Sequence, residues 1–219
     1  MSEQNLWQKF IWFSERAILM IIAIATLFAT GIELVRMISS QTVNLSDLFL
    51  LFIYAEVLGG DLNSGGQRKE GSMTAPNAEA VQRCICEALT NSGINSDAID
   101  VINGHLTATS KDVLEIENWT KALNRKGSDF PYINSLKSMV GHCLAAAGSI
   151  ECVATILQLS EQFICPNINC EDVHSEILDL IDEEKIPKTL LKRELNIAIK
   201  ASFGFGDVNG CVIFKKYSE

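Results

Sequence analysis

The pattern of apolar and polar positions divides the chain into two unequal parts. Most of the excess apolar character lies before about residue 58, and the stretch Ala17–Ile32 (AILMIIAIATLFATGI) contains no charged side chain. About 20 apolar residues cross a bilayer, and the stretch from Phe10 to Val35 is long enough if its charged residues lie near the ends. The pattern therefore predicts a membrane-type α-helix, which we place at Ala17–Val35.

Two other interpretations of this apolar run stay open. It also fits a buried core helix, or the apolar region of a secretory signal, because Lys9 and Arg16 precede it. Arg36 follows the run directly, so the positive-inside rule does not fix an orientation. We favour the membrane-spanning interpretation.

A second apolar segment, Leu45–Leu58, is short for a membrane span and contains Asp47 and Glu56. The Gly-rich and polar stretch from Asp61 to Gly71 then predicts a loop. We accordingly expect a hydrophobic N-terminal membrane segment over residues 1–58 and a second domain over residues 59–219.

After this loop, strand-like and helix-like stretches alternate, as a layered α/β fold requires. Short apolar runs at Ile99–Asn103 and Pro131–Ser135 predict buried strands, and Ile197–Ala201 with Gly210–Phe214 predicts a closing hairpin. Helical spacing predicts three helices, at Asn77–Thr90, Asp112–Leu123 and His142–Leu159. The first helix is expected to bury Ala80, Val81, Cys84, Ile85, Ala88 and Leu89.

Composition narrows the range of partners and of bound groups. A net charge of -9 and a pI near 4.9 argue against nucleic acid, because binding phosphate needs a basic surface. The seven cysteines form an odd set with no CxxC pair and no histidine at zinc-ligand spacing, so we expect reduced thiols and no metal site.

Two of the three histidines occupy distinctive positions. His105 (in NGHLTAT) and His142 (in KSMVGH) each come shortly after a predicted strand, where side chains can assemble into a site. Taken singly, such a histidine is more often a hydrogen-bonded buried imidazole. His174 lies in an acidic loop, and we expect it to have only a structural role.

These two motifs, together with GHCLAAAG from Gly141 and SFGFG from Ser202, resemble the C-terminal half of a β-ketoacyl-acyl-carrier-protein synthase. The resemblance runs from about Ile53 to Lys216. It implies one half of a thiolase-like layered α/β fold, in which two similar halves pack back to back. The N-terminal half of such enzymes has no counterpart in the sequence.

The N-terminal part of the chain resembles the PsiE family of small membrane proteins. The residues that carry this are Gly31–Val35 (GIELV) and Asp47–Val57 (DLFLLFIYAEV). The stretch Ile53–Gly60 also resembles the strand that opens the ketoacyl synthase C-terminal half, so the two resemblances overlap. We interpret the overlap as the trace of a recombined or truncated and fused gene.

The resemblance to ketoacyl synthases implies catalytic roles for four residues. His105 and His142 would donate hydrogen bonds to the thioester oxygen of the enolate that forms when a malonyl thioester loses carbon dioxide. The charge of Lys137 would tune this site, with Glu151 as its carboxylate partner.

It also implies substrate contacts. Thr107 and Thr109 would line the pantetheine arm of a carrier-bound substrate, and Phe205 would act as a gate whose backbone N–H joins the acyl oxyanion hole. Phe203, in the same motif, is expected to contact substrate as well. The implied partner is an acyl carrier protein, with its phosphopantetheine thioester as substrate and no separate cofactor.

Three departures from the family pattern bear on function. Leu106 replaces a glycine, and Asp207 with Val208 changes the gating loop and adds a negative charge that we expect beside the site. The nucleophilic cysteine of the family lies in the N-terminal half, and none of the seven cysteines matches it. Cys143, expected at the start of a helix, corresponds to a packing residue.

The implied function is therefore an acyltransferase of decarboxylative Claisen condensation, in fatty acid or polyketide-like biosynthesis, that is incomplete. The alternative is a membrane-anchored non-catalytic module that binds a carrier protein, or a fusion remnant. In either case the enzyme-like domain would be membrane-associated and cytoplasmic. A single half leaves apolar surface uncovered, above all on the helix from His142, so we expect a dimer, a complementary N-terminal half, or poor solubility.

Overall fold

The computed structural model describes residues 53–66 and 76–218. The membrane-type helix predicted at Ala17–Val35 lies outside these ranges, as does most of the PsiE-like segment. Within the described ranges, no helix is long and apolar enough to cross a membrane.

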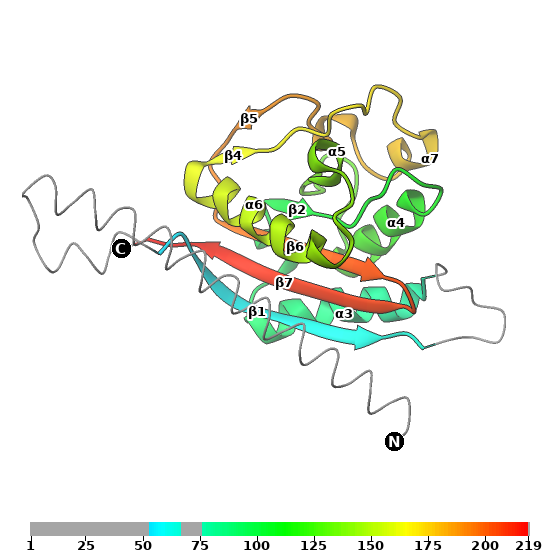
Figure 1. Ribbon diagram of the computed structural model, residues 1–219, viewed down its shortest axis with the longest axis horizontal. Coiled ribbons are helices and arrows are strands. Elements are labelled where there is room, and N and C mark those ends of the chain that lie inside the picture. The colour runs from blue at the N-terminus through cyan, green and yellow to red at the C-terminus, as the bar shows by residue number, and fades with distance from the viewer. Residues whose placement is uncertain (1–52, 67–75, 219) are drawn as a thin grey trace, which may run out of the picture. The chain divides into compact units, whose positions relative to one another are not determined.

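A five-stranded mixed sheet forms the centre of the fold (Figure 1). The two strands β1 and β7 pair antiparallel, as do β7 and β6, whereas β6, β2 and β3 run parallel to one another. In sheet order the strands are β1 (Ala55–Ser64), β7 (Val208–Lys216), β6 (Ile197–Gly204), β2 (Val101–Asn103) and β3 (Tyr132–Asn134). The predicted strands and the closing hairpin are confirmed.

The first strand is longer than the sequence suggests. The predicted loop at Asp61–Gly71 is wrong at its start, because β1 continues to Ser64, where it pairs with Val208 of β7. Pairing with β7 satisfies backbone groups along β1 and so overrides its glycine-rich, polar composition. The compact unit that contains the sheet begins at Tyr54.

Helices cover both faces of the sheet. The helices α3 (Ala78–Ser92) and α4 (Asp112–Leu123) pack on one face, and α6 (Ala147–Glu161) packs on the other (Figure 1). In α3, the Asn77 side chain caps the first turn and Gly93, at φ 66°, ends the helix. Its buried residues are the six that the sequence predicts.

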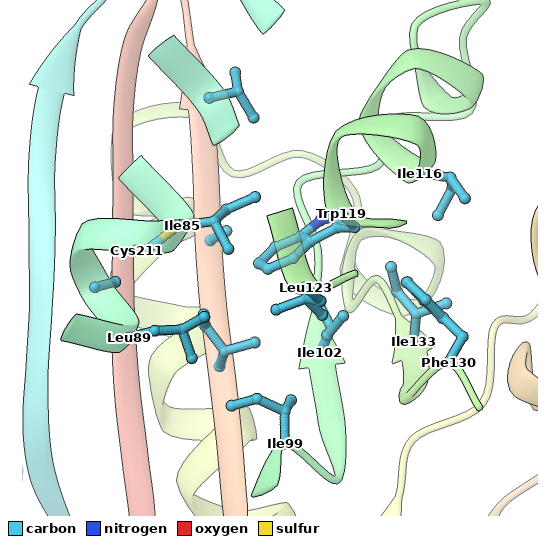
Figure 2. Packing of buried hydrophobic residues seen from close by; sticks show 14 of the residues in the cluster. Ile85, Leu89, Ile99, Ile102, Ile116, Trp119, Leu123, Phe130, Ile133 and Cys211 are labelled. Carbon is cyan, nitrogen blue, oxygen red and sulfur yellow. The ribbon is translucent and has the colours of Figure 1, made fainter. Parts of the chain in front are cut away.

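The main core lies between the sheet and the helices α3 and α4. Figure 2 shows Trp119 of α4 in this cluster, with Ile85 of α3 and Ile102 of β2 nearby. Because side chains alternate along a strand, Val101 faces the opposite way and packs with Leu159 of α6. The result is a three-layer α/β/α arrangement.

The helix on the second face starts later than predicted. The prediction of helix from His142 is wrong over its first five residues, since α6 begins at Ala147 after a short 3-10 turn, Leu144–Ala146. Gly141 at φ 75° and Leu144 at φ 49° have left-handed backbone that an α-helix does not allow. Cys143 is therefore not at the start of an α-helix.

The helix α6 has polar side chains on its buried face and apolar ones on its exposed face. Glu151, Thr155 and Gln158 are buried beside Ala147 and Leu159, while Ile150, Val153 and Leu157 are 39%, 44% and 42% exposed. The expectation of uncovered apolar surface on this helix is confirmed. The smaller elements are α5 (Lys137–Val140), β4 (Phe163–Ile164), α7 (Ser175–Leu178), β5 (Leu191–Lys192) and the 3-10 turns Ser96–Ala98 and Glu183–Lys185.

Candidate active site

The two histidines meet at the carboxyl edge of the parallel strands. His105 follows the end of β2, and His142 follows β3 through the short helix α5. Their ring centroids are 5.5 Å apart and the ring planes are inclined by 80°. Because the carboxyl ends of neighbouring parallel strands share one edge of a sheet, residues far apart in sequence come together here.

The contacts of His142 define its tautomer. Its Nδ1 atom accepts the backbone N–H of Leu144 over 3.1 Å, so Nδ1 carries no proton and the proton of the neutral ring lies on Nε2. The His142 side chain is exposed, which leaves this N–H available to a ligand.

Two carboxylates of α4 hold the loop that carries His105. The Glu115 oxygens accept the backbone N–H groups of His105 and Leu106 over 2.7 and 2.9 Å, and Asp112 accepts that of Thr107 over 3.1 Å. A Cβ at Gly104 would lie 2.8 Å from Glu115 Oε1, so a glycine is needed for this approach. The loop is thus wrapped around the first turn of α4.

The imidazole of His105 is held neutral. Burial, followed by the nearby cations Lys137 and Lys200 and by His142, lowers its pKa to about 3. The His105 Nδ1 atom is buried and has no hydrogen-bond partner among the residues that the structure describes. At neutral pH the buried ring of His105 is therefore uncharged, and it lies next to the exposed ring of His142.

A buried carboxylate bridges two lysines beneath this pair. The Nζ atoms of Lys137 and Lys200 each lie 2.7 Å from Glu151, the first at Oε1 and the second at Oε2. Both are close charge pairs between buried side chains. Burial lowers the pKa of Lys137, and Glu151 opposes this shift.

Sequence reasoning named Lys137 and Glu151 but missed Lys200. One signal was present: Lys200 is a single charge in the otherwise apolar run IAIKA of a strand that is buried on both faces. The role of Glu115 was also missed. Its signal was its place in the first turn of the helix that follows the histidine loop.

Three of the four predicted substrate-contacting residues lie in the His105 loop or in the turn after β6, and the fourth packs against the core. The Thr107 and Thr109 hydroxyls lie 3.3 Å apart on the His105 loop, and Phe205 is 65% exposed in the turn between β6 and β7. Phe203 instead packs against the core, with its ring centroid 6.1 Å from that of Trp119. Its ring therefore faces a core side chain.

The carboxylate of Asp207 binds the start of α3. Its Oδ1 atom accepts the backbone N–H of Asn77, at the start of α3, over 2.9 Å, and its backbone oxygen accepts that of Gly65. A Cβ at Gly65 would lie 1.6 Å from Asp207 Oδ2, so the side chain fills the space next to that residue. The expected negative charge beside the site is thus used to fasten the turn after β6 to the start of α3.

The remaining histidine and the cysteines have ordinary structural surroundings. The Nδ1 atom of His174 caps α7 by accepting the Glu176 N–H. All seven cysteines are free thiols. Burial raises the pKa of five of these thiols, which are Cys86, Cys152, Cys165, Cys170 and Cys211. For Cys152 the pKa rises to about 11. Among the described residues, no cluster of His, Cys, Asp or Glu could hold a metal ion.

Comparison with known proteins identifies relatives of this chain. The 3-oxoacyl-acyl-carrier-protein synthase 2 of Vibrio harveyi is 35% identical over 170 residues, which cover 76% of this chain and 39% of that enzyme. Synthase 1 of Haemophilus influenzae is 36% identical over 168 residues, 76% of this chain and 38% of that enzyme. The chain thus spans less than half the length of these relatives.

Solved structures give the same result. The ishigamide ketosynthase/chain length factor superimposes with a TM-score of 0.68 and 27% identity, covering 80% of this chain and 41% of that one. A type II PKS ketosynthase in complex with its acyl-carrier protein gives 0.66 and 31%, covering 76% and 39%. The family description "Beta-ketoacyl synthase, C-terminal domain" matches residues 54–171, and the chain belongs to this family.

Proposed function

We propose that this chain supplies the decarboxylation half of a β-ketoacyl-acyl-carrier-protein synthase site, and that it cannot condense acyl groups alone. One observation supports this above all: His105 and His142 face each other at 5.5 Å, with the Nε2–H of His142 free to donate. Two imidazoles at this separation can reach one thioester oxygen, because each hydrogen bond spans about 3 Å.

The proposed step is the loss of carbon dioxide from a malonyl thioester. The bond between the α-carbon and the carboxylate breaks, and its electron pair forms an enolate whose oxygen gains negative charge. Hydrogen-bond donors aimed at that oxygen stabilise the transition state. A proton from solvent then converts the enolate to an acetyl thioester. No metal or cofactor takes part in this proposal.

The surroundings of the histidines fit a donor role. His105 is uncharged at neutral pH, so it does not form a fixed ion pair with the substrate carboxylate. Lys137, paired with Glu151, supplies positive charge at short range without being free to move. These features favour stabilisation of charge that develops during the reaction.

The substrate is proposed to arrive on an acyl carrier protein. A related ketosynthase has been solved in complex with its acyl-carrier protein, which supports the same kind of partner here. The exposed Thr107 and Thr109 hydroxyls, on the His105 loop, would contact the pantetheine arm. Phe205, exposed at the turn after β6, would act as the gate, and Phe203 would support it from the core.

Condensation is proposed to need a second half. A nucleophilic cysteine requires a lowered pKa, whereas burial raises that of five of the seven thiols. The apolar stripe of α6, formed by Ile150, Val153 and Leu157, offers a surface on which a complementary N-terminal half or a second copy would pack.

The same thiol environments favour one alternative. With the pKa of five thiols raised, the chain would also serve as a membrane-anchored, non-catalytic module that binds a carrier protein, or it would be a fusion remnant. In each case we propose a membrane-associated protein whose enzyme-like domain is cytoplasmic. Enzymatic decarboxylation separates the first proposal from this one.

The test uses the full chain with radiolabelled malonyl and acyl carrier proteins. We expect slow decarboxylation, no condensed product and no covalent acylation of a cysteine. His105→Ala and His142→Ala should each remove the decarboxylation, because each removes a donor to the enolate oxygen. Decarboxylation that survives both substitutions, or an acylated cysteine with condensed product, would overturn the proposal. Complete inactivity would favour the non-catalytic module.

A further inference from the structure

A row of buried polar side chains crosses the sheet under α6. Asn134 of β3, Asn103 of β2 and Lys200 of β6 lie in register on neighbouring strands. Each contacts a different residue of α6. The Asn134 amide donates to Gln158 Oε1 over 2.6 Å, and the Asn103 amide donates to Thr155 Oγ1 over 3.1 Å. Lys200 forms an ion pair with Glu151.

Lys200 is the charged member of this row. Its side chain is 2% exposed, and Nζ also donates to Ser202 Oγ over 3.0 Å and to the Ala201 carbonyl. No aqueous screening acts on such a group, so its charge must be balanced by protein atoms. The balancing group is Glu151, whose other oxygen is the one that Lys137 contacts.

The geometry of the shared carboxylate shows what Lys200 does. Without Lys200, Glu151 Oε2 would be a buried acceptor without a charged partner, and the carboxylate would be free to turn about its last torsion. Lys137 Nζ would then lose its fixed counter-charge next to the histidines. Lys200 thus fixes the orientation of Glu151 from the side opposite to Lys137.

We infer that Lys200 is a positioning residue of the two-histidine site: it acts through Glu151 to fix Lys137 and adds a second buried positive charge beneath His105. This inference rests on the proposed function of the histidines for its effect on activity. It does not rest on that function for its effect on the charge state of His105, which can be measured separately.

The charge state of His105 depends on groups from every element around it. Glu115 and Asp112 of α4 bind the loop that carries His105. Glu151 of α6 lies between the ammonium groups of Lys137 and Lys200, which belong to α5 and β6. The ring of His142 faces that of His105. The two lysines and His142 oppose protonation of His105. Removing one lysine should therefore make protonation easier.

Three variants separate charge from packing. Lys200→Met removes the charge and keeps most of the length, whereas Lys200→Arg keeps the charge. Thr155→Val is the matched control, because it removes a buried contact of the same row without removing charge. All are made in the full chain, solubilised in a mild detergent, where the three histidines allow assignment of ring signals by single substitutions to Gln.

The first measurement is a pH titration of the His105 ring by NMR, between about pH 4 and 8. Wild type, Lys200→Arg and Thr155→Val should show almost no titration of His105 in this range. In Lys200→Met the midpoint should move up by roughly one pH unit or more, so that protonation becomes visible below about pH 5. A Lys200→Met curve identical to wild type, or one that Arg does not restore, would overturn the inference.

The second measurement is malonyl decarboxylation by the same proteins. Lys200→Met should lower the rate roughly tenfold with little change in KM, and Thr155→Val should retain it, because only the first disturbs the fixed charges. An equal loss in both variants would show that Lys200 has only a packing role. If wild type does not decarboxylate at all, the proposed function fails, and the NMR titration alone decides the role of Lys200.

Discussion

The Oε1 atom of Glu115 accepts the backbone N–H of His105 over 2.7 Å, so a buried carboxylate holds the main chain of a site histidine. The same atom accepts the Trp119 indole N–H over 3.3 Å. Burial raises the pKa of Glu115 to about 7, and these donors oppose the rise. The support of the His105 loop therefore titrates close to neutral pH.

Glu115 and His105 should affect stability in opposite directions as pH changes. The folded-state pKa of Glu115, about 7, is above its ordinary 4.5, so the folded state binds more protons and the unfolding free energy falls as pH rises between these values. The pKa of His105, about 3, is below its ordinary 6.5, so its contribution rises with pH from about 3 to 6.5. The two slopes partly cancel in the wild-type protein.

We predict that Glu115→Gln removes the decrease in unfolding free energy that Glu115 causes as pH rises. Relative to wild type, its unfolding free energy should increase by about 3 kcal/mol between about pH 4.5 and 8, whatever its stability at the lower pH. Urea unfolding at a series of pH values measures this. His105→Gln is the control of opposite sign, since it should lose stability relative to wild type as pH rises to about 6.5. Parallel curves for Glu115→Gln and wild type would contradict the prediction.

A second prediction concerns the shared carboxylate. Glu151→Gln leaves the ammonium groups of Lys137 and Lys200 buried without a counter-charge, and should cost about 3–5 kcal/mol of unfolding free energy. Lys137→Met should cost less, because Glu151 keeps its contact with Lys200. Denaturant unfolding of both variants tests the order. A loss in Lys137→Met as large as that in Glu151→Gln would show that Lys200 does not balance the carboxylate.

Much of the architecture follows from local sequence signals. The helix predicted at Asp112–Leu123 has those bounds in the structure, because its periodic apolar face and its end at Asn124, in a left-handed conformation, are local features. The approach of His105 to His142 could also be predicted, since both follow parallel strands that are neighbours in the sheet. The catalytic role of the pair stays a prediction.

The features that sequence reasoning missed depend on distant residues. Lys200 contacts Glu151 on another element, and nothing near Lys200 in the sequence indicates a carboxylate. The extension of β1 to Ser64 depends on β7, at the far end of the chain. The late start of α6 depends on the backbone of Leu144, whose N–H bonds to the His142 ring rather than within a helix. Local propensity carries no information on such contacts.

A third prediction concerns the N-terminal part, which lies outside the described residues. We expect Ala17–Val35 to be embedded in a membrane, because the stretch is long enough to span and contains a single charge, Glu33. Fractionation of cells expressing the full chain, followed by high-salt and carbonate washes, tests this. The protein should resist both washes, and a matched chain starting at Tyr54 provides the control. Recovery of the full chain in the soluble fraction would show the prediction to be wrong.

The last prediction concerns the apolar stripe of α6, Ile150, Val153 and Leu157. Val153→Glu with Leu157→Lys places an attractive pair one turn apart on the exposed face and removes apolar surface. Because these side chains are 44% and 42% exposed, the unfolding free energy should change by no more than about 0.5 kcal/mol.

The same double variant should bind less of an apolar fluorescent dye, and it should sediment as a smaller species than wild type in the same detergent, because the stripe is a surface for association. Leu190→Lys is the control, since Leu190 is 56% exposed and is not part of α6. A large loss of stability in the double variant would mean that the stripe is already covered within the chain. Unchanged dye binding and sedimentation, with stability retained, would mean that association takes place on another surface.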